Sequence, residues 1–118
     1  MSSPFEIKYI ELKTGYSDNG PAWIGKVKKS KSGTTLYFNN KAFRKYNGIS
    51  GNYFDVESGE EYWISGVKKD GYDRHWAGNG KITIDRKIIN EYLEITSAKA
   101  LVIHNFLITD IEDCFPEE

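Results

Sequence analysis

The chain has 118 residues, of which 39% are hydrophobic and 14% aromatic, and its formal net charge is -1. This length suits one domain with its own core, and this composition excludes an intrinsically disordered chain. Tyr, Phe, Trp and Gly are plentiful, whereas Cys and Met occur once each. Such a mixture favours strands and tight turns. We therefore predict a single, mostly β domain over residues 1–118.

The first half of the chain predicts strands separated by turns. Residues 5–13 alternate between apolar and polar, then shift phase at Ile10, which predicts a strand with a β-bulge. Residues 15–21 have the composition of a loop, and further strands are predicted at 22–29 and 34–38. Asn39 and Asn40 end the second of these. Residues 41–46 fit either one helical turn or a short strand.

The second half contains the clearest hairpin and the clearest helix. Residues 53–56 and 61–64 flank a four-residue turn at 57–60, which predicts a β-hairpin. Further short strands are predicted at 72–76 and 81–84. From Asp85 the apolar residues Ile88, Ile89, Tyr92 and Leu93 fall on one helical face, and Asp85 suits the N-cap. Residues 98–111 fit a pair of strands or a helix, and we favour strands.

These elements predict a mostly β (β-rich α+β) fold, which is a small barrel or a strongly bent antiparallel sheet with one short helix near residues 85–94. Residues 96–118 form a candidate C-terminal extension with an acidic tail. Cys114, the single cysteine, excludes an intramolecular disulfide. The N-terminus does not resemble a secretory signal, and the longest apolar run, 100–103, is too short to cross a membrane. We therefore expect a cytoplasmic protein that binds no membrane.

A short repeat stands out. Residues 23–29 (WIGKVKK) and 63–69 (WISGVKK) share five of seven residues. Their alternation predicts two equivalent strands with Trp and Val facing inward and Lys facing outward. We therefore expect the core to contain Trp23, Phe38, Trp63 and one or both of Tyr62 and Trp76. The rings left available for the surface are Tyr37, Phe43, Tyr46, Tyr53 and Tyr72.

Charge is segregated along the sequence. No acidic residue occurs between Asn19 and Phe54, a stretch that holds seven Lys and Arg residues, whereas residues 104–118 contain five acidic residues and no Lys or Arg. Cations interleaved with rings suit nucleic acid, because phosphates accept the charge and bases stack. The alternatives are a solvated basic surface, or lysines that discourage pairing at a strand edge. The candidate binding residues are Lys28, Lys29, Tyr37, Arg44, Lys45, Tyr46, Lys68, Lys69, Arg74 and His75.

Evidence for catalysis is weaker. On a strand, Asp73 and His75 would point to the same face, so that the carboxylate could orient a general base. Glu61 is a third weak candidate. We favour a solvated polar pair, because no nucleophile is visible and no catalytic or phosphate-binding motif occurs. The residues that could bind a metal are scattered along the chain, so we predict neither a metal nor a cofactor.

Residues 9–93 resemble a family of small bacterial proteins with no agreed function. The resemblance is carried by residues 13–16 (KTGY), 20–25 (GPAWIG), 48–53 (GISGNY), 60–66 (EEYWISG) and 73–78 (DRHWAG). Some similar members carry the label of 1-deoxy-D-xylulose-5-phosphate synthase. That enzyme is a large thiamine-diphosphate protein, and this chain lacks its length and any motif for that cofactor. The resemblance therefore implies no catalytic residues.

The leading hypothesis is a non-enzymatic small β binding module with a basic and aromatic face, for which nucleic acid is the favoured partner. One alternative is a protein-interaction or inhibitor domain that uses exposed tyrosines and a sheet edge. The other is a small enzyme centred on Asp73 and His75.

Overall fold

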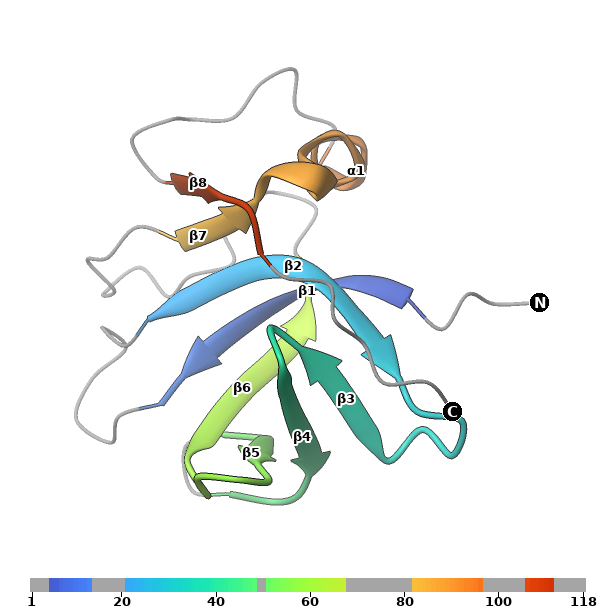
Figure 1. The fold of residues 1–118 in the computed structure, drawn as a ribbon, viewed down its shortest axis with the longest axis vertical. Coiled ribbons are helices and arrows are strands. Elements are labelled where there is room, and N and C mark those ends of the chain that lie inside the picture. The colour runs from blue at the N-terminus through green and yellow to red at the C-terminus, as the bar shows by residue number, and fades with distance from the viewer. Residues whose placement is uncertain (1–4, 14–20, 49–50, 68–81, 97–105, 112–118) are drawn as a thin grey trace.

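The computed structural model of the chain describes residues 5–13, 21–48, 51–67, 82–96 and 106–111. Six of its strands form a closed antiparallel barrel in which each strand pairs with the next one in the sequence (Figure 1). Strand β1 pairs with both β2 and β6 and thereby closes the barrel. This arrangement confirms the predicted mostly β fold with a small barrel. The six strands are β1 (Phe5–Leu12), β2 (Ala22–Lys29), β3 (Thr35–Phe38), β4 (Lys41–Lys45), β5 (Tyr53–Asp55) and β6 (Glu61–Gly66).

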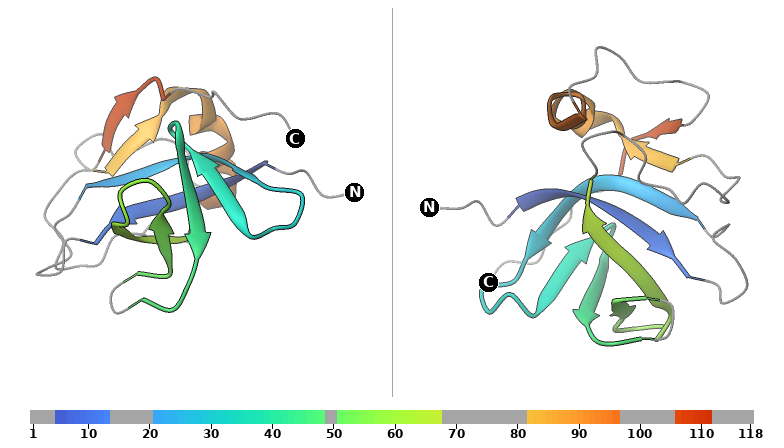
Figure 2. Two further views of the ribbon diagram at one scale, coloured as in Figure 1. Left: turned by 60° about the horizontal axis from the view of Figure 1, so that its bottom comes forward. Right: turned by 180° about the vertical axis from the view of Figure 1, so that it is seen from behind.

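A second layer covers one side of the barrel. It contains β7 (Ile82–Asp85), the 3-10 helix η1 (Arg86–Ile88), α1 (Ile89–Thr96) and β8 (Phe106–Thr109). Strand β7 runs parallel to the first half of β2, and β8 runs parallel to β7. Strand β3 pairs with the last residues of β2. The sheet therefore branches along β2, with β7, β8 and α1 on one side and β3 to β6 on the other (Figures 1 and 2).

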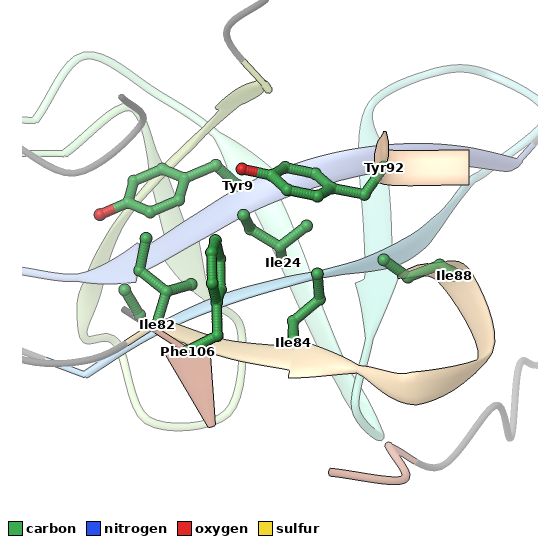
Figure 3. Packing of buried hydrophobic residues seen from close by; sticks show 8 residues of the cluster. Tyr9, Ile24, Ile82, Ile84, Ile88, Tyr92 and Phe106 are labelled. Atoms are coloured by element: carbon green, nitrogen blue, oxygen red, sulfur yellow. The ribbon is translucent and has the colours of Figure 1, made fainter. Parts of the chain in front are cut away.

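Two hydrophobic clusters fill this architecture. The outer cluster lies between the β1–β2 pair and the second layer (Figure 3), and its Tyr92 and Phe106 rings meet at 5.7 Å between centroids. It contains Tyr9, Ala22, Ile24, Ile82, Ile84, Ile88, Tyr92 and Phe106. The barrel cluster contains Ile10, Val27, Leu36, Phe38, Phe43, Tyr62, Ile64 and Ile111.

The phase shift in β1 has a different cause from the predicted one. The pairing of β1 with β2 and with β6 skips no residue, so the predicted β-bulge is wrong. Instead, Tyr9 belongs to the outer cluster and Ile10 to the barrel cluster. Because β1 is buried on both faces, consecutive apolar residues are needed there.

The two tryptophan segments are not equivalent. Ile10 of β1 pairs with Trp23 on β2 and with Ile64 on β6, so the two segments are offset by one residue. A one-residue offset turns every side chain to the opposite face. Trp23 is accordingly half-buried against the barrel cluster, whereas Trp63 is 42% exposed. The prediction of Trp63 as a core residue is wrong.

The turn between β3 and β4 agrees with its sequence. Asn39 and Asn40 have φ angles of 51° and 63°, which suit a two-residue turn between antiparallel strands. Residues 41–45 therefore form a strand rather than a helical turn. The predicted hairpin of β5 and β6 is confirmed.

The helix begins as predicted, because the Asp85 side chain accepts a hydrogen bond from the Lys87 N–H. Ile88 and Tyr92 are buried on its inner face, with Ile89 and Leu93 packed beside them. Among the described residues, no helix is long and apolar enough to cross a membrane. The strand predicted at 72–76 lies outside the described residues. Of residues 98–111, the described part contains strand β8.

Candidate nucleic-acid interface

The structure describes six of the predicted binding residues, which are Lys28, Lys29, Tyr37, Arg44, Lys45 and Tyr46. The others, Lys68, Lys69, Arg74 and His75, lie outside the described residues. The catalytic candidate Asp73 also lies outside them, whereas Glu61 is the first residue of β6.

Three of the six described residues, Lys28, Tyr37 and Arg44, share the outer surface of the barrel. Paired residues of antiparallel strands have their side chains on the same face. Lys28 pairs with Tyr37, which pairs with Ala42. In the neighbouring row, Arg44 pairs with Thr35 and Phe54. Both rows alternate with buried residues, so they face outward.

The second row leads to a group of aromatic side chains. Phe54 pairs with Glu61, and the Tyr46 ring packs edge-on against Phe54 at 5.0 Å between centroids. Trp63 follows Glu61 by two residues on the same face of β6. We call Arg44, Tyr46, Phe54, Glu61 and Trp63 the ring face.

Lys29 and Lys45 have a different position. They pair with Leu36 and Tyr53, whose side chains belong to the inner side of the barrel. Because each lysine is the last residue of its strand, its side chain is exposed at the end of the barrel. Phe43 is 1% exposed within the barrel cluster. The prediction of Phe43 as a surface ring is therefore wrong, because its partner Leu36 also faces inward.

Tyr46 and Glu61 form a fixed pair. The Tyr46 hydroxyl donates a hydrogen bond to Glu61 Oε1 at 2.7 Å. This bond to the carboxylate raises the pKa of Tyr46 above its ordinary value of 10.0. Gly48 makes the pair sterically feasible, since a Cβ at position 48 would lie 2.0 Å from Glu61 Oε1 and 2.9 Å from Tyr46 Cζ.

Trp63 and Phe54 are the members of the ring face that sequence reasoning missed. The alternation within β6 carried the signal, because Glu61, Trp63 and Ser65 fall on one face, opposite to the buried Tyr62 and Ile64. The repeat of residues 23–29 at 63–69 instead predicts that Trp63 faces inward like Trp23.

Glu11, the neighbour of Trp63 on β1, has hydrogen-bond partners on its own strand and at Lys13. Trp63 pairs with Glu11, which is buried. The Glu11 carboxylate accepts hydrogen bonds from the Tyr9 hydroxyl and, at 3.0 Å, from Lys13 Nζ.

The cations near the ring face are not neutralised by described carboxylates. Within the described ranges, Arg44, Lys29 and Lys45 have no acidic side chain at ion-pair distance. Asp110 of the acidic C-terminal part pairs with Arg86, at 3.4 Å. Ion pairs between two described residues include Lys8–Glu6, Lys13–Glu11, Lys41–Asp55, Arg86–Asp110 and Lys87–Asp85.

A small pocket opens near the β3–β4 turn. Its volume is about 190 Å³ including the open mouth, which is below the usual size of a small-molecule site. Burial, followed by the nearby Glu60 and Asp55 carboxylates, raises the pKa of Tyr62, one of the lining residues, to about 12. The lining residues are Ile10, Trp23, Phe38, Asn39, Lys41, Phe43 and Tyr62.

The interaction of the catalytic candidate Glu61 that the structure describes is the hydrogen bond that its carboxylate accepts from the Tyr46 hydroxyl. Among those residues, no three His, Cys, Asp or Glu side chains gather as a metal site requires.

Comparisons of the chain with protein-family models, with curated proteins and with solved structures find no match. The family resemblance therefore stays a prediction.

Proposed function

We propose that the chain is a binding module for single-stranded nucleic acid, which crosses the outer surface of β2 to β6. The observation that carries this proposal is the ring face. There the rings of Tyr46, Phe54 and Trp63 lie on the outer surface of the β5–β6 pair, and Arg44 pairs with Phe54. A closed barrel of this size needs its rings for the core, so exposed rings on one surface call for a reason.

Stacking argues for single strands. In a duplex the faces of the bases are hidden, whereas a single strand presents them to aromatic side chains. Each stacked base contributes about 1–3 kcal/mol, largely independent of sequence. Trp63, at 42% exposure, is the largest ring available for such a contact.

The neighbouring cations supply the phosphate contacts. Arg44 lies in the same row as Phe54, and Lys28 lies beside Tyr37 in the next row. Further exposed lysines, Lys29 and Lys31, lie at the β2–β3 turn. A single-stranded nucleic acid that crosses from this turn to Trp63 would therefore contact the cationic side chains first and the aromatic rings second.

Fluorescence anisotropy with a labelled mixed-sequence oligonucleotide of about 20 nucleotides, longer than the site of one small barrel, tests the proposal. We expect tighter binding of the single strand than of its duplex, and loss of affinity as salt rises from about 50 to 200 mM. Absence of binding to the single strand at low salt would refute the proposal.

Two variants separate the contributions. Trp63→Ala should weaken binding about 5- to 150-fold through lost stacking. Arg44→Gln should reduce the salt slope by about 0.7, the value for one phosphate of a single strand. Leu107→Ala removes another exposed apolar side chain, on β8, and serves as the matched control with unchanged affinity.

A second candidate function is protein binding through β8. Leu107 and Ile108 of this strand are 52% and 43% exposed, and within the described residues β8 pairs only with β7. An edge strand with exposed apolar residues can accept a strand from a partner. Loss of a co-purifying protein in the variant Ile108→Lys, with oligonucleotide binding retained, would favour this function.

A further inference from the structure

The turn between β2 and β3 lies at an end of the barrel that carries several cations. Strand β2 ends at Lys29, and Lys31 follows in the turn that leads to Thr35, the first residue of β3. Thr35 pairs with Arg44, so β4 ends beside this turn, and Lys45 is its last residue (Figure 1). All four cationic residues are exposed. We call them the turn cations, which are Lys29, Lys31, Arg44 and Lys45.

Described carboxylates do not compensate the turn cations. In the part of the chain that the structure describes, no acidic side chain lies at ion-pair distance from any of them. Glu6 of β1 is within reach of the Lys29 charge, but it forms its ion pair with Lys8, at 3.0 Å. Like charges that are held close repel each other, so an anion placed among the turn cations is bound favourably.

The same turn carries a series of three hydroxyl groups. Ser32 Oγ lies 3.3 Å from Ser30 Oγ and 2.8 Å from Thr34 Oγ1, so two hydrogen bonds join the three oxygens. Ser30 is 8% exposed, and its Oγ accepts a hydrogen bond from the Thr35 N–H at 3.1 Å, which ties the series to the start of β3. Each hydroxyl has one hydrogen to donate. The two bonds use two of the three hydrogens, and an anion near the exposed Thr34 would receive the third.

We propose that the β2–β3 turn binds the terminal phosphate of the single strand, and that the strand then runs from this turn across the ring face. This inference rests on the proposed function, since only a strand that is held by the ring face has an end at this position. Arg44 belongs both to the turn cations and to the ring face, so the two sites are contiguous. The turn thus fixes one end of the ligand, and the rings bind its bases largely without regard to sequence.

A terminal phosphate suits the turn better than an internal one. A phosphate monoester carries about 1.5 to 2 negative charges near pH 7 and three strong acceptor oxygens, whereas an internal phosphodiester carries one charge. The turn offers partners for both features, namely the ammonium groups of Lys29 and Lys31 and a hydroxyl hydrogen at Thr34. We therefore expect a phosphorylated end to bind about 3- to 10-fold more tightly than a hydroxyl end, which is within what two exposed ion pairs contribute.

Competition anisotropy with unlabelled oligothymidylates of about 8 nucleotides, within the site size of one small barrel, tests this inference. The three competitors carry a 5′-phosphate, a 3′-phosphate or hydroxyl groups at both ends. At least one phosphorylated competitor should bind more tightly than the unphosphorylated one. Equal binding of all three would refute the site for a terminal phosphate and leave the proposed function standing. Absence of binding of all three at low salt would refute both.

Inorganic phosphate separates a strand end from a free phosphate. At the concentration at which the phosphorylated oligothymidylate displaces the labelled probe, inorganic phosphate should displace none, because it lacks the bases that the ring face binds. Displacement at this concentration would show that the turn binds free phosphate, and would overturn the joint site of turn and ring face.

Variants assign the gain from phosphorylation to the turn. The double variant Lys29→Gln/Lys31→Gln should abolish this gain and still bind the unphosphorylated oligothymidylate. Ser32→Ala interrupts the series of hydroxyl groups, and a reduced gain is expected. Lys41→Gln/Arg86→Gln removes two exposed cations elsewhere and serves as the matched control with an unchanged gain. Circular dichroism verifies the fold of each variant. An unchanged gain in the folded Lys29→Gln/Lys31→Gln variant would refute the role of the turn.

Discussion

At the scale of single residues, Gly25 of β2 leaves room inside the barrel for the Phe38 ring. A Cβ at position 25 would lie 2.6 Å from Phe38 Cε1, and Phe38 is 3% exposed, so the ring has little freedom to move. Gly25→Ala should therefore lower the free energy of unfolding by about 1–3 kcal/mol, as overpacking of a core does. Urea denaturation followed by fluorescence measures this change.

Gly66 provides the matched control, because it also lies in a barrel strand, yet no atom lies within 4 Å of the Cβ that alanine would add. Gly66→Ala should change the free energy of unfolding by no more than about 0.5 kcal/mol. Equal losses in both variants would mean that the contact with Phe38 is not the cause.

Asp55 organises the turn between β5 and β6. Its carboxylate is 2% exposed, accepts a hydrogen bond from the Glu57 N–H at 2.9 Å, and lies 3.5 Å from Lys41 Nζ. Burial by itself raises the pKa of Asp55. The hydrogen bonds from Glu57 and Ser58, together with the Lys41 ammonium, outweigh burial and hold this pKa below its ordinary value of 3.8.

Because the pKa of Asp55 is lowered in the folded state, the free energy of unfolding depends on pH. The ionised form is favoured in the folded state, so its contribution is complete above the unfolded pKa and is lost as pH falls through the folded pKa. Asp55→Asn should lower the free energy of unfolding by about 1 kcal/mol at pH near 7. The difference from the original protein should shrink below a pH of about 3.8.

Urea titrations of both proteins across this pH range measure that difference, and a constant difference would contradict the expectation. Glu57→Gln changes the net charge equally on an exposed side chain of the same turn. It serves as the control and should leave stability nearly unchanged.

At the scale of elements, hairpins and the helix could be predicted because local rules determine them. The β5–β6 turn follows from its Ser and Gly residues, and the start of the helix follows from the Asp85 side chain, which caps the Lys87 N–H. These signals act over a few residues and do not depend on distant neighbours.

The orientation of the tryptophan segments could not be predicted in this way. Both β2 and β6 pair with β1, and barrel closure offsets them by one residue relative to Ile10. Closure is a property of the whole sheet, so the similar sequences at 23–27 and 63–67 meet opposite surroundings.

In the candidate site, too, some residues can be predicted from the local sequence and others only from the pairing of the strands. Lys28, Tyr37, Arg44 and Tyr46 were candidates from composition alone, and alternation places the first three on one outer surface. Phe54 and Trp63 entered the site only when the register between β4, β5 and β6 was known. The sequence therefore predicts the cations together with Tyr37 and Tyr46, whereas the register of the strands adds Phe54 and Trp63.

At the scale of the whole molecule, the two clusters share strands and a C-terminal connection. Strands β1 and β2 contribute to both clusters. Residues 106–111 also span both, since Phe106 lies in the outer cluster and Ile111 in the barrel cluster. Lys87 Nζ donates a hydrogen bond to the Ile111 carbonyl at 2.5 Å, which ties this segment to the start of the helix.

This sharing implies that the barrel and the second layer unfold together. Ile111→Ala should lower the free energy of unfolding by about 2–4 kcal/mol, because Ile111 is 6% exposed and its loss leaves a cavity in the barrel cluster. Thermal unfolding followed by tryptophan fluorescence and by far-ultraviolet circular dichroism should give one shared, lowered midpoint. Leu107→Ala, in the same segment but 52% exposed, should leave it nearly unchanged. Separate midpoints for the two signals would show that the layers are independent, because a connection through Ile111 requires both to lose their structure at once.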